Sequence, residues 1–399
     1  MIMVGTLTAA IGTSSRAESA RAGKEAAEQA LAQLPGFEPK LAFVFASSWF
    51  NQLPLLQAIA GVLEDIPLIG ASTAGEILSN GPASHTCIVV LLSSFSLKWA
   101  TGFAENIDQA PRKAGQQVAY MATKTFSSQQ RLGFLFFGDG LVARYGDVMR
   151  GMQEVLGTNA LLVGGMAGDD LRFTQTFQYH RQQVITGGIV GAIIGGDGAL
   201  GIGLEHGFAP ISKPRRVTRA SANVLLELDR KPAASVYEEY LGSDTVGRMR
   251  QEGLTRQSLA YPLGIQAEGS SRFLLRTVAS FQNDGSLKCT GEILEGSWMQ
   301  LMISSRSLAL DAARRAAQEA IQTVTKPACV LVFSSFARPK LQGSHTASEE
   351  VAAIRQVVGS AVPLAGFYTY GEQGPADSDA MHNHVSMQTG SVLVVAIGS

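Results

Sequence analysis

The chain has 399 residues, of which 46% are hydrophobic and 16% charged, and its formal net charge is −1. This composition predicts a compact globular protein of two or three domains with a large core, and it argues against an intrinsically disordered chain. Because the net charge is close to zero, we expect neither nucleic acid nor an anionic membrane surface as a partner.

The three cysteines, Cys87, Cys289 and Cys329, lie far apart and form no CxxC pair. This spacing argues against a disulfide framework or a zinc site and favours a reducing compartment. Residues 1–11 lack the basic segment of a signal peptide, and no apolar run reaches the length of a membrane span. We therefore expect a cytoplasmic protein without membrane insertion.

The predicted helices and strands follow one another in the same order three times. After an initial strand, the first unit has a helix over 16–34, a buried strand over 41–46, a helix over 53–63 and a strand over 85–92. The second unit repeats this order over 110–125, 132–137, 147–156 and 188–194, and the third over 307–324, 329–333, 349–358 and 390–397.

A different region, near residues 214–295, separates the second unit from the third. It contains a predicted helix over 233–241 and a predicted hairpin, 272–281 with 287–293, whose turn is Asn283-Asp284-Gly285. The sequence as a whole therefore predicts an α/β protein. Its repeated strand-helix-strand units form largely buried mixed sheets, and a smaller hairpin-containing insertion lies near 214–295.

One segment recurs in each unit. Residues 66–77 read Ile-Pro-Leu-Ile-Gly-Ala-Ser-Thr-Ala-Gly-Glu-Ile, residues 362–373 read Val-Pro-Leu-Ala-Gly-Phe-Tyr-Thr-Tyr-Gly-Glu-Gln, and a degenerate copy over 162–170 is one residue shorter. Each copy is an apolar run that stops at a glycine, passes small or hydroxyl residues, and meets an acidic residue after a second glycine. This pattern predicts a buried strand that ends in a tight turn and presents hydroxyls and a carboxylate.

Several of these motifs, taken in order, resemble the marker motifs of FIST sensory proteins. They are residues 70–77, 164–170 and 366–372, together with His382-Asn383; residues 230–233, 237–242 and 261–264 resemble the start of the C-terminal FIST half. The resemblance covers almost the whole chain. It implies a FIST N-terminal domain over 1–215 and a FIST C-terminal domain over 216–399.

The resemblance also implies a function. FIST proteins are associated with small-ligand sensing in signal transduction, and amino acids or similar metabolites are proposed as ligands. Some stand-alone bacterial members are described as haem-binding nitric oxide sensors that regulate a partner histidine kinase. We see no kinase, cyclase or methyl-accepting segment in this chain, so its output would pass through a separate protein.

The repeated turns supply the candidate ligand-binding residues, because open α/β sheets bind ligands at the carboxyl ends of their strands. A buried carboxylate there could hold a ligand ammonium, with hydroxyls beside it. The candidates are Ser72, Thr73, Gly75, Glu76, Tyr368, Thr369, Gly371 and Glu372. The alternative is that each glutamate satisfies nearby backbone amides while the glycines only permit the turns.

Two further groups of charged residues invite a functional interpretation. Arg338 and Arg144 follow strands at equivalent places, and either could face an anionic ligand group; the alternative is a surface arginine paired with a nearby acid. Asp169 and Asp170 have no third acidic or histidine ligand near them in the sequence, so we expect turn and cap roles there rather than a metal site.

The histidines are candidates for ligand or haem contacts. His382 and Asn383 follow the third-unit turn and are candidate ligand-binding residues. His382, His384 and His345 are the candidate axial ligands if haem is bound, with His85, His180 and His206 as weaker ones. There is no CxxCH, so haem would not be attached covalently.

An enzyme is the less favoured interpretation. The stretch from Gly70 to Gly75 has one residue too many for a GxSxG nucleophile elbow, and neither a GxGxxG nor a P-loop motif is present. Ser47-Ser48 and Ser334-Ser335 follow strands, but the sequence indicates no partner base. We expect a non-enzymatic sensor of an amino-acid-like metabolite that signals through a partner such as a histidine kinase. A haem-based nitric oxide sensor and a small-molecule hydrolase or transferase are the alternatives.

Overall fold

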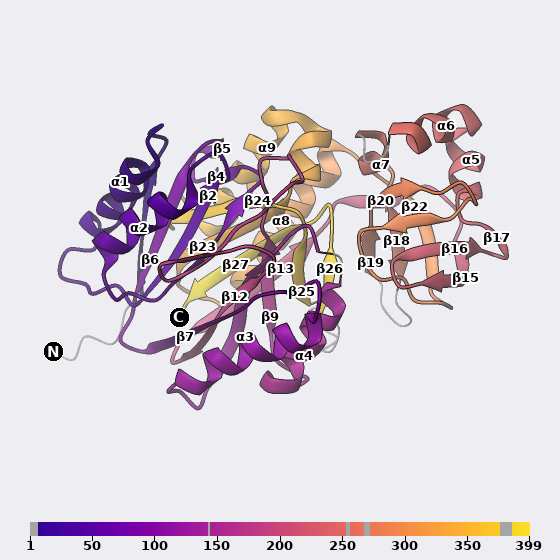
Figure 1. Cartoon of the computed structure of the whole chain (residues 1–399). Helices are drawn as coiled ribbons and strands as arrows, with labels where there is room; N and C mark the ends of the chain where they lie inside the picture. Colours follow the sequence, from indigo (N-terminus) through magenta and orange to yellow (C-terminus); the bar gives the residue numbers. More distant parts are fainter. Residues whose placement is uncertain (1–6, 143, 253–255, 267–271, 376–384) are drawn as a thin grey trace.

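The computed structural model describes residues 7–142, 144–252, 256–266, 272–375 and 385–399. The chain forms a larger lobe built from three sheets and a smaller lobe built from one sheet and short helices (Figure 1). The predicted α/β class is confirmed, as is the hairpin-containing insertion. None of the described helices is long and apolar enough to cross a bilayer.

The larger lobe consists of three units, and the first two have the predicted order of elements. Contrary to expectation, the third unit does not start near Met299, because its first strand is formed by residues 199–205, before the insertion. The first has β1 (Thr8–Ser14), α1 (Ser19–Ala32), β2 (Leu41–Ser47), α2 (Gln52–Leu63), β3 (Leu68–Thr73), β4 (Glu76–Leu78), β5 (Gly81–Ala83) and β6 (Cys87–Ser93). The second has β7 (Leu97–Ala104), α3 (Pro111–Thr125), β8 (Arg131–Gly138), α4 (Tyr145–Leu156), β9 (Leu162–Met166), β10 (Gln178–His180), β11 (Gln183–Ile185) and β12 (Ile189–Gly196). The third has β13 (Ala199–Glu205), α8 (Arg306–Gln322), β23 (Pro327–Ser335), α9 (Ala337–Val358), β24 (Leu364–Thr369), β25 (Glu372–Pro375), β26 (Val385–Gln388) and β27 (Val392–Gly398).

The three units share one strand order, in which the first strand is followed by the last, the second and the third. The sheets accordingly contain β1-β6-β2-β3, β7-β12-β8-β9 and β13-β27-β23-β24. The second and third strands of each unit pair in parallel. This order puts the apolar strands that the sequence predicts as buried in the interior of each sheet.

Each unit gives a hairpin to its neighbour's sheet. The hairpin β4–β5 pairs with β24, β10–β11 pairs with β3, and β25–β26 pairs with β9. Every third strand therefore has its outer edge covered by another unit, which prevents an exposed, unpaired edge. The exchange is cyclic and links the three sheets into one lobe.

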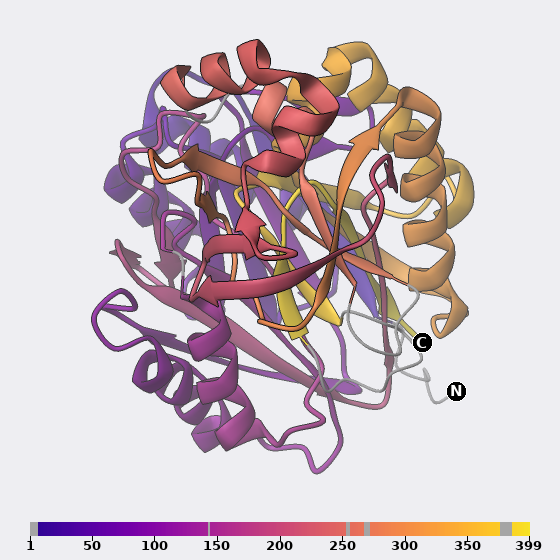
Figure 2. The same cartoon turned by 90° about the vertical axis from the view of Figure 1, so that its right-hand side faces the viewer.

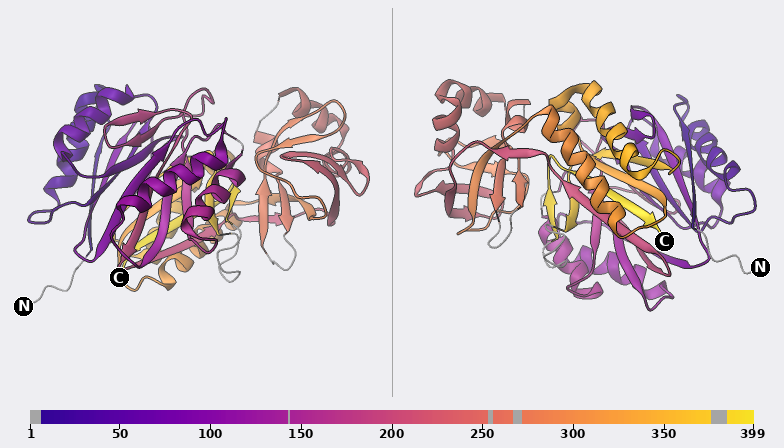
Figure 3. Two further views of the ribbon diagram at one scale, coloured as in Figure 1. Left: turned by 60° about the horizontal axis from the view of Figure 1, so that its bottom comes forward. Right: turned by 180° about the vertical axis from the view of Figure 1, so that it is seen from behind.

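The three sheets face one another across a common apolar core. Phe45, Phe137 and Phe333 occupy equivalent positions on β2, β8 and β23, and their ring centroids lie 5.4, 6.0 and 5.5 Å apart in contacts close to edge-to-face. The helix pairs α1–α2, α3–α4 and α8–α9 cover the outer faces (Figure 3). The larger lobe thus has an approximate threefold repeat around a phenylalanine centre.

The first glycine of the repeated motif is required by close packing. A Cβ added at Gly70, Gly164 or Gly366 would lie within 2 Å of a carbonyl oxygen on the adjacent parallel strand, at 1.9, 1.9 and 1.8 Å respectively. Such distances are far below van der Waals contact, so these positions cannot hold a side chain. This glycine therefore recurs because the adjacent parallel strand packs too closely against it to leave room for a side chain.

The smaller lobe is inserted between β13 and α8. Its elements are β14 (Phe208–Pro210), β15 (Arg215–Ser221), β16 (Val224–Leu228), β17 (Lys231–Pro232), α5 (Ser235–Leu241), α6 (Ser243–Glu252), α7 (Arg256–Ala260), β18 (Leu263–Gln266), β19 (Phe273–Arg276), β20 (Val278–Phe281), β21 (Leu287–Cys289) and β22 (Trp298–Ser304). The predicted hairpin is correct only in its inner part, where β20 pairs with β21. The outer part, β19, pairs instead with β18, so the expected long strand divides near Thr277.

The smaller lobe contacts the carboxyl-end face of the larger one (Figure 2). β13 runs parallel to β23, because both are antiparallel to β27, and the insertion leaves from the carboxyl end of β13. A small apolar cluster of Phe208, Leu275 and Met302 lies at this junction. Polar contacts surround it, including Arg272 with Glu319 at 2.5 Å.

Candidate functional site

Glu76 and Glu372, the two acids of the repeated turns, are fully buried and have protein partners. The Thr73 hydroxyl donates to one oxygen of Glu76, and the Thr86 amide donates to the other at 3.0 Å. The hydroxyl of Thr369 and the amide of Ser391, the latter at 3.2 Å, make the same two contacts with Glu372. In each turn, both oxygens of the buried carboxyl group therefore accept hydrogen bonds from the protein itself.

Burial changes the ionisation of both glutamates. Desolvation raises the pKa of Glu76 to about 8, although hydrogen bonds from Thr73 and Thr86 act in the opposite direction. The pKa of Glu372 rises to about 8 for the same reason. Both groups are therefore mostly protonated at neutral pH.

The second unit has an amide where the other two have an acid. Gln178 pairs with Ala71 at the register position that Glu76 takes opposite Phe367 and Glu372 takes opposite Gly165. Its side-chain oxygen accepts from the amide of Gly188 at 3.2 Å, just before the last strand of its unit. The sequence interpretation aligned the Asp169-Asp170 pair with the two glutamates. That alignment is wrong, because residues 167–177 form a long loop before β10 instead of a tight turn.

The remaining residues of the predicted ligand-binding set lie close to the same turns. Ser72 is buried, donates to the carbonyl of Gly168 at 2.6 Å and accepts from the amide of Phe177 at 2.9 Å. Gly75 has φ +122°, which a side chain would strain, and the ring of Tyr368 lies against it. The carbonyl oxygen of Gly371 accepts from the amide of Met166 at 2.8 Å. Direct contact of this set with a ligand stays a prediction.

Arg338 is buried, and its guanidinium N–H groups bind other residues of the chain. It forms an ion pair with Glu350 at 3.0 Å and donates to the carbonyls of His206, Ala309 and Gly390. These contacts tie α9 to the junction with the smaller lobe. Arg144, by contrast, is an exposed residue that pairs with Asp147 at 2.7 Å.

The predicted histidine sites divide into three groups. His382, Asn383 and His384 lie outside the described residues. His345 is exposed on α9, and its Nδ1 lies 3.5 Å from a carboxylate oxygen of Glu349. Its role as a haem ligand stays a prediction. The described residues contain no group of three or more histidine, cysteine or acidic side chains that could hold a metal ion.

His180, which is buried, and His206, which is half-buried, already have partners. The ring nitrogen Nδ1 of His206 accepts from the amide of Phe208 at 3.0 Å, and Nε2 of His180 is 3.1 Å from the hydroxyl of Thr101. Burial lowers the pKa of each to about 4, so both are neutral at pH 7. Each of these hydrogen bonds engages one ring nitrogen, Nδ1 in His206 and Nε2 in His180.

A polar layer caps the phenylalanine centre at the carboxyl ends of the central strands. Ser47, Asp139 and Ser335 follow the three core phenylalanines by two residues, so they lie on the same face of each strand. Each side chain accepts a hydrogen bond from the amide two residues later, at 3.1, 2.8 and 3.4 Å. The sequence showed the two serine pairs but gave no signal that Asp139 completes the layer.

Residues 167–177, which we call the axial loop, cross this layer and contact all three units. The amides of Gly168 and Asp170 donate to the carbonyls of Ser72 and Thr73, both at 3.0 Å. The amide of Ala167 donates to Gly138 at 2.8 Å, and the Tyr370 hydroxyl donates to Asp169. The loop breaks the threefold repeat where the three strand ends meet.

Asp169 organises the axial loop from within. Its carboxylate accepts from the amides of Phe173, Thr174 and Gln175 at 2.8, 2.6 and 2.9 Å. Burial alone would raise the pKa of Asp169, but the bonds from Tyr370 and these amides outweigh it and lower the pKa below its usual value. Asp169 is thus an ionised structural acid, as the cap interpretation expected.

Asp170 contacts the turn after β2. Its Oδ2 accepts from the hydroxyls of Ser47 and Ser48 at 2.8 and 2.5 Å and from the amide of Trp49 at 3.1 Å. The Arg172 guanidinium donates to the Ser48 hydroxyl oxygen at 2.7 Å. The polar layer therefore contains a carboxylate held by three converging donors.

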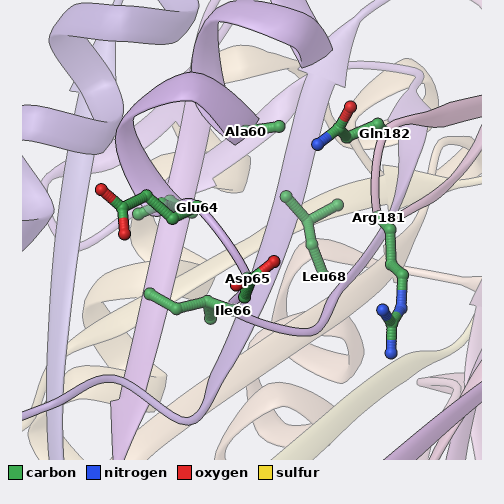
Figure 4. A pocket seen from close by; sticks show the side chains of 8 residues that line it. Ala60, Glu64, Asp65, Ile66, Leu68, Arg181 and Gln182 are labelled. Carbon is green, nitrogen blue, oxygen red and sulfur yellow. The ribbon is translucent and has the colours of Figure 1, made fainter.

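A surface hollow lies at the opposite end of β3. It is lined by Glu64 and Asp65 after α2, by Arg181 and Gln182 in the β10–β11 turn, and by Leu68 of β3 (Figure 4). None of the predicted site residues lines it. The axial loop and the polar layer beneath it are therefore the better candidate site.

Comparison with known proteins places the chain in a family. The FIST N domain matches residues 40–231 and the FIST C domain matches residues 233–375. The chain belongs to the FIST family. FIST domains are associated with signal transduction. The border between the two matches falls at β17 in the smaller lobe; the division at residues 215 and 216 stays a prediction.

Relatives of this FIST protein carry no assigned function. An uncharacterized protein of Methanocaldococcus jannaschii is 28% identical over 283 residues, which cover 65% of this chain and 53% of that protein. The chain thus spans about half the length of that relative. An uncharacterized protein of Mycobacterium tuberculosis is 25% identical over 399 residues, covering 93% of this chain and 96% of its own length.

Solved structures give only weak likenesses. A cyanuric acid hydrolase from A. caulinodans aligns over 98% of this chain and 100% of its own with 9% identity and a TM-score of 0.36. PurLQS from Thermotoga maritima aligns over 99% of this chain and 72% of its own with 10% identity and a TM-score of 0.24. Likenesses at these scores support no inference about this FIST protein.

Proposed function

We propose that this FIST protein is a sensor that binds a small ligand at the carboxyl-end face of its larger lobe and signals through a separate protein such as a histidine kinase. The observation that carries the proposal is the axial loop over the polar layer. Hydroxyls and carboxylates gather there above an apolar centre, where α/β proteins bind ligands.

The backbone of the axial loop supports a role in binding. Asp170, Leu171 and Phe173 have φ values of 55°, 64° and 53°, in the left-handed region that side chains disfavour. Such residues gather at binding sites and switches, where the surrounding contacts hold them in place. Phe173 is exposed yet stacks on Tyr370 at 4.6 Å, so the loop is fixed to the third unit through an aromatic contact.

A chain of contacts leads from this face to the smaller lobe. Tyr370 bonds Asp169, and Glu372 lies two residues after Tyr370 and bonds Ser391. In the same turn as Ser391, the Thr389 hydroxyl is 3.0 Å from that of Thr277 in the smaller lobe. A ligand that moves the axial loop would thereby shift the position of the smaller lobe. We propose that the partner protein binds the surface of this smaller lobe.

Thermal unfolding of the purified full-length chain tests the sensor proposal. We expect one amino acid or related metabolite from a panel to raise the melting temperature, because a ligand that binds only the folded state stabilises it. The same ligand should change the affinity for a captured histidine kinase. A panel that leaves the melting temperature unchanged, with a chain that remains colourless after expression with haem, would contradict the proposal. Turnover of the metabolite would show an enzyme instead.

A further inference from the structure

The turn after β2 holds the carboxylate of Asp170 as a receptor holds an anionic ligand. Three donors converge on the single oxygen Oδ2, namely the hydroxyls of Ser47 and Ser48 and the amide of Trp49, at 2.8, 2.5 and 3.1 Å. Three convergent donors of this kind suit a carboxylate ligand, since hydrogen bonds to a charged acceptor are stronger than those to a neutral one.

The donors are positioned independently of Asp170. The Ser47 amide bonds the Thr86 carbonyl at 3.2 Å within the first sheet, and the Ser47 carbonyl accepts from the amide of Phe50 and the side chain of Gln52. Ser47 and Ser48 are both buried, at a strand end packed in the core. We call Ser47, Ser48 and the Trp49 amide the carboxylate cradle. The cradle would therefore keep its shape if the Asp170 side chain moved away.

The carboxylate, by contrast, comes from the axial loop, which contains neither helix nor strand. Asp170 has φ 55° and the following Leu171 φ 64°, so the residue that fills the cradle stands in a disfavoured backbone conformation. The loop gains the hydrogen bonds of the cradle but must adopt this disfavoured backbone conformation to make them. An external carboxylate could make the same hydrogen bonds without requiring that conformation.

The surroundings of the cradle suit an incoming anion. Arg172 is exposed and its guanidinium donates to Ser48, which places a positive charge beside the donors. The side chain of Trp49 is 49% exposed and stacks on His85 with ring centroids 5.2 Å apart, so one wall of the approach is an aromatic surface open to solvent. Charge and stacking together favour a small carboxylate with an apolar or planar body.

We propose that Ser47, Ser48 and the Trp49 amide form a carboxylate-binding site in which Asp170 is an internal ligand, displaced when an external carboxylate binds. The inference rests on the proposed function, because it locates the sensor's ligand and names its chemical class. Displacement of Asp170 frees the axial loop and thereby provides the first step of the signal. An internal competitor of this kind also lowers the apparent affinity for the external ligand.

The test compares acetate binding to the wild-type chain and to Asp170→Gly. Glycine empties the cradle and accepts the left-handed backbone, so this change should spare the fold. With sodium acetate as the probe and sodium chloride of equal ionic strength as the control, we measure the fluorescence of Trp49 in a Trp99→Phe/Trp298→Phe background. We expect Asp170→Gly to bind acetate with a Kd at least tenfold lower than the wild type.

Two further variants complete the test. Adding Ser48→Ala to Asp170→Gly should abolish the gain, because one of the three donors is lost. If Asp170→Gly does not fold, Asp170→Asn replaces it: its neutral amide is a weaker competitor, and the Kd for acetate should fall at least threefold. Equal acetate binding by all variants, or no preference for acetate over chloride in either Asp170 variant, would overturn the inference.

The outcome is separable from that of the proposed function. If no metabolite binds the wild-type chain while acetate binds Asp170→Gly, the cradle is a carboxylate site in a protein that is not the proposed sensor. If a metabolite binds the wild-type chain but acetate does not bind Asp170→Gly, the sensor uses another site and the inference fails alone.

Discussion

Gln178 in the second unit and Glu372 in the third occupy equivalent positions and make equivalent hydrogen bonds. Each accepts a hydrogen bond at 3.2 Å from the amide just before the last strand of its own unit, Gly188 in one case and Ser391 in the other. Each also pairs with the third strand of a neighbouring unit at the same register. An amide oxygen and a carboxyl oxygen can both accept this hydrogen bond.

This equivalence predicts that Glu76→Gln and Glu372→Gln fold normally. The free energy of unfolding, from urea denaturation, should change by less than about 1.5 kcal/mol for each, because the glutamine oxygen still accepts from the backbone amide and the glutamine NH2 group can donate to the neighbouring threonine hydroxyl oxygen. Glu372→Ala should cost about 2–4 kcal/mol, since it leaves a cavity and removes the acceptor from buried donors. If Glu372→Gln keeps its stability but no longer binds a ligand that binds the wild type, the result supports the predicted contact between the carboxyl group and that ligand.

The raised pKa values of the two glutamates predict a pH dependence of stability. The folded pKa of each is about 8 against an ordinary value of 4.5, so the folded state binds the proton more tightly. The stabilisation is complete below pH 4.5 and is lost as the pH rises through about 8, with a slope of about 1.4 kcal/mol per pH unit for each group.

We expect the wild-type melting temperature to fall between about pH 6.5 and 8.5, a range above that in which His180 and His206 titrate. The double variant Glu76→Gln/Glu372→Gln should fall less steeply over the same range. Parallel profiles for the two proteins would show that neither glutamate titrates there.

Part of this architecture follows from the sequence, and the reason is local. The motif copies at 66–77 and 362–373 mark the same strand and turn, so their repetition alone predicts equivalent units. The first glycine of each copy can be recognised in the sequence because it recurs with the motif. The structure shows why it is needed, since a carbonyl oxygen on the adjacent strand leaves no room for a side chain. The apolar strands β2, β8 and β23 lie where their continuous hydrophobic runs predict.

What the sequence does not reveal depends on distant partners. The exchanged hairpins use strands as short as β4 and β10, whose few residues carry no periodicity, and their pairing is decided by another unit's edge. Asp170 lies beside an acidic neighbour after a glycine, which imitates the repeated turn, whereas its partners Ser47 and Ser48 lie far away in the sequence. The carboxylate cradle therefore appears only once the chain is folded.

Arg338 and Arg144 offer a matched pair for stability, since the sequence assigns them equivalent places. Arg338→Ala should destabilise the chain by about 3–5 kcal/mol, because it leaves the buried carboxylate of Glu350 without its counter-charge. Arg144→Ala should change the free energy of unfolding by less than about 1 kcal/mol, because its ion pair with Asp147 is on the surface. Similar values for the two variants in urea denaturation would contradict this assignment of the two arginines.

The hydroxyl of Tyr370 should control the mobility of the axial loop. Tyr370→Phe removes the hydrogen bond to Asp169 but keeps the ring that stacks on Phe173. We expect faster amide hydrogen exchange at residues 173–175, whose amides depend on the position of the Asp169 carboxylate, with a global destabilisation of about 1–2 kcal/mol. Tyr120→Phe is the control, because Tyr120 is 59% exposed on α3. If exchange in the loop matches the wild type while Glu372 and Ser391 are also unaffected, Tyr370 does not link the loop to the third unit, and the proposed route to the smaller lobe fails at its first contact.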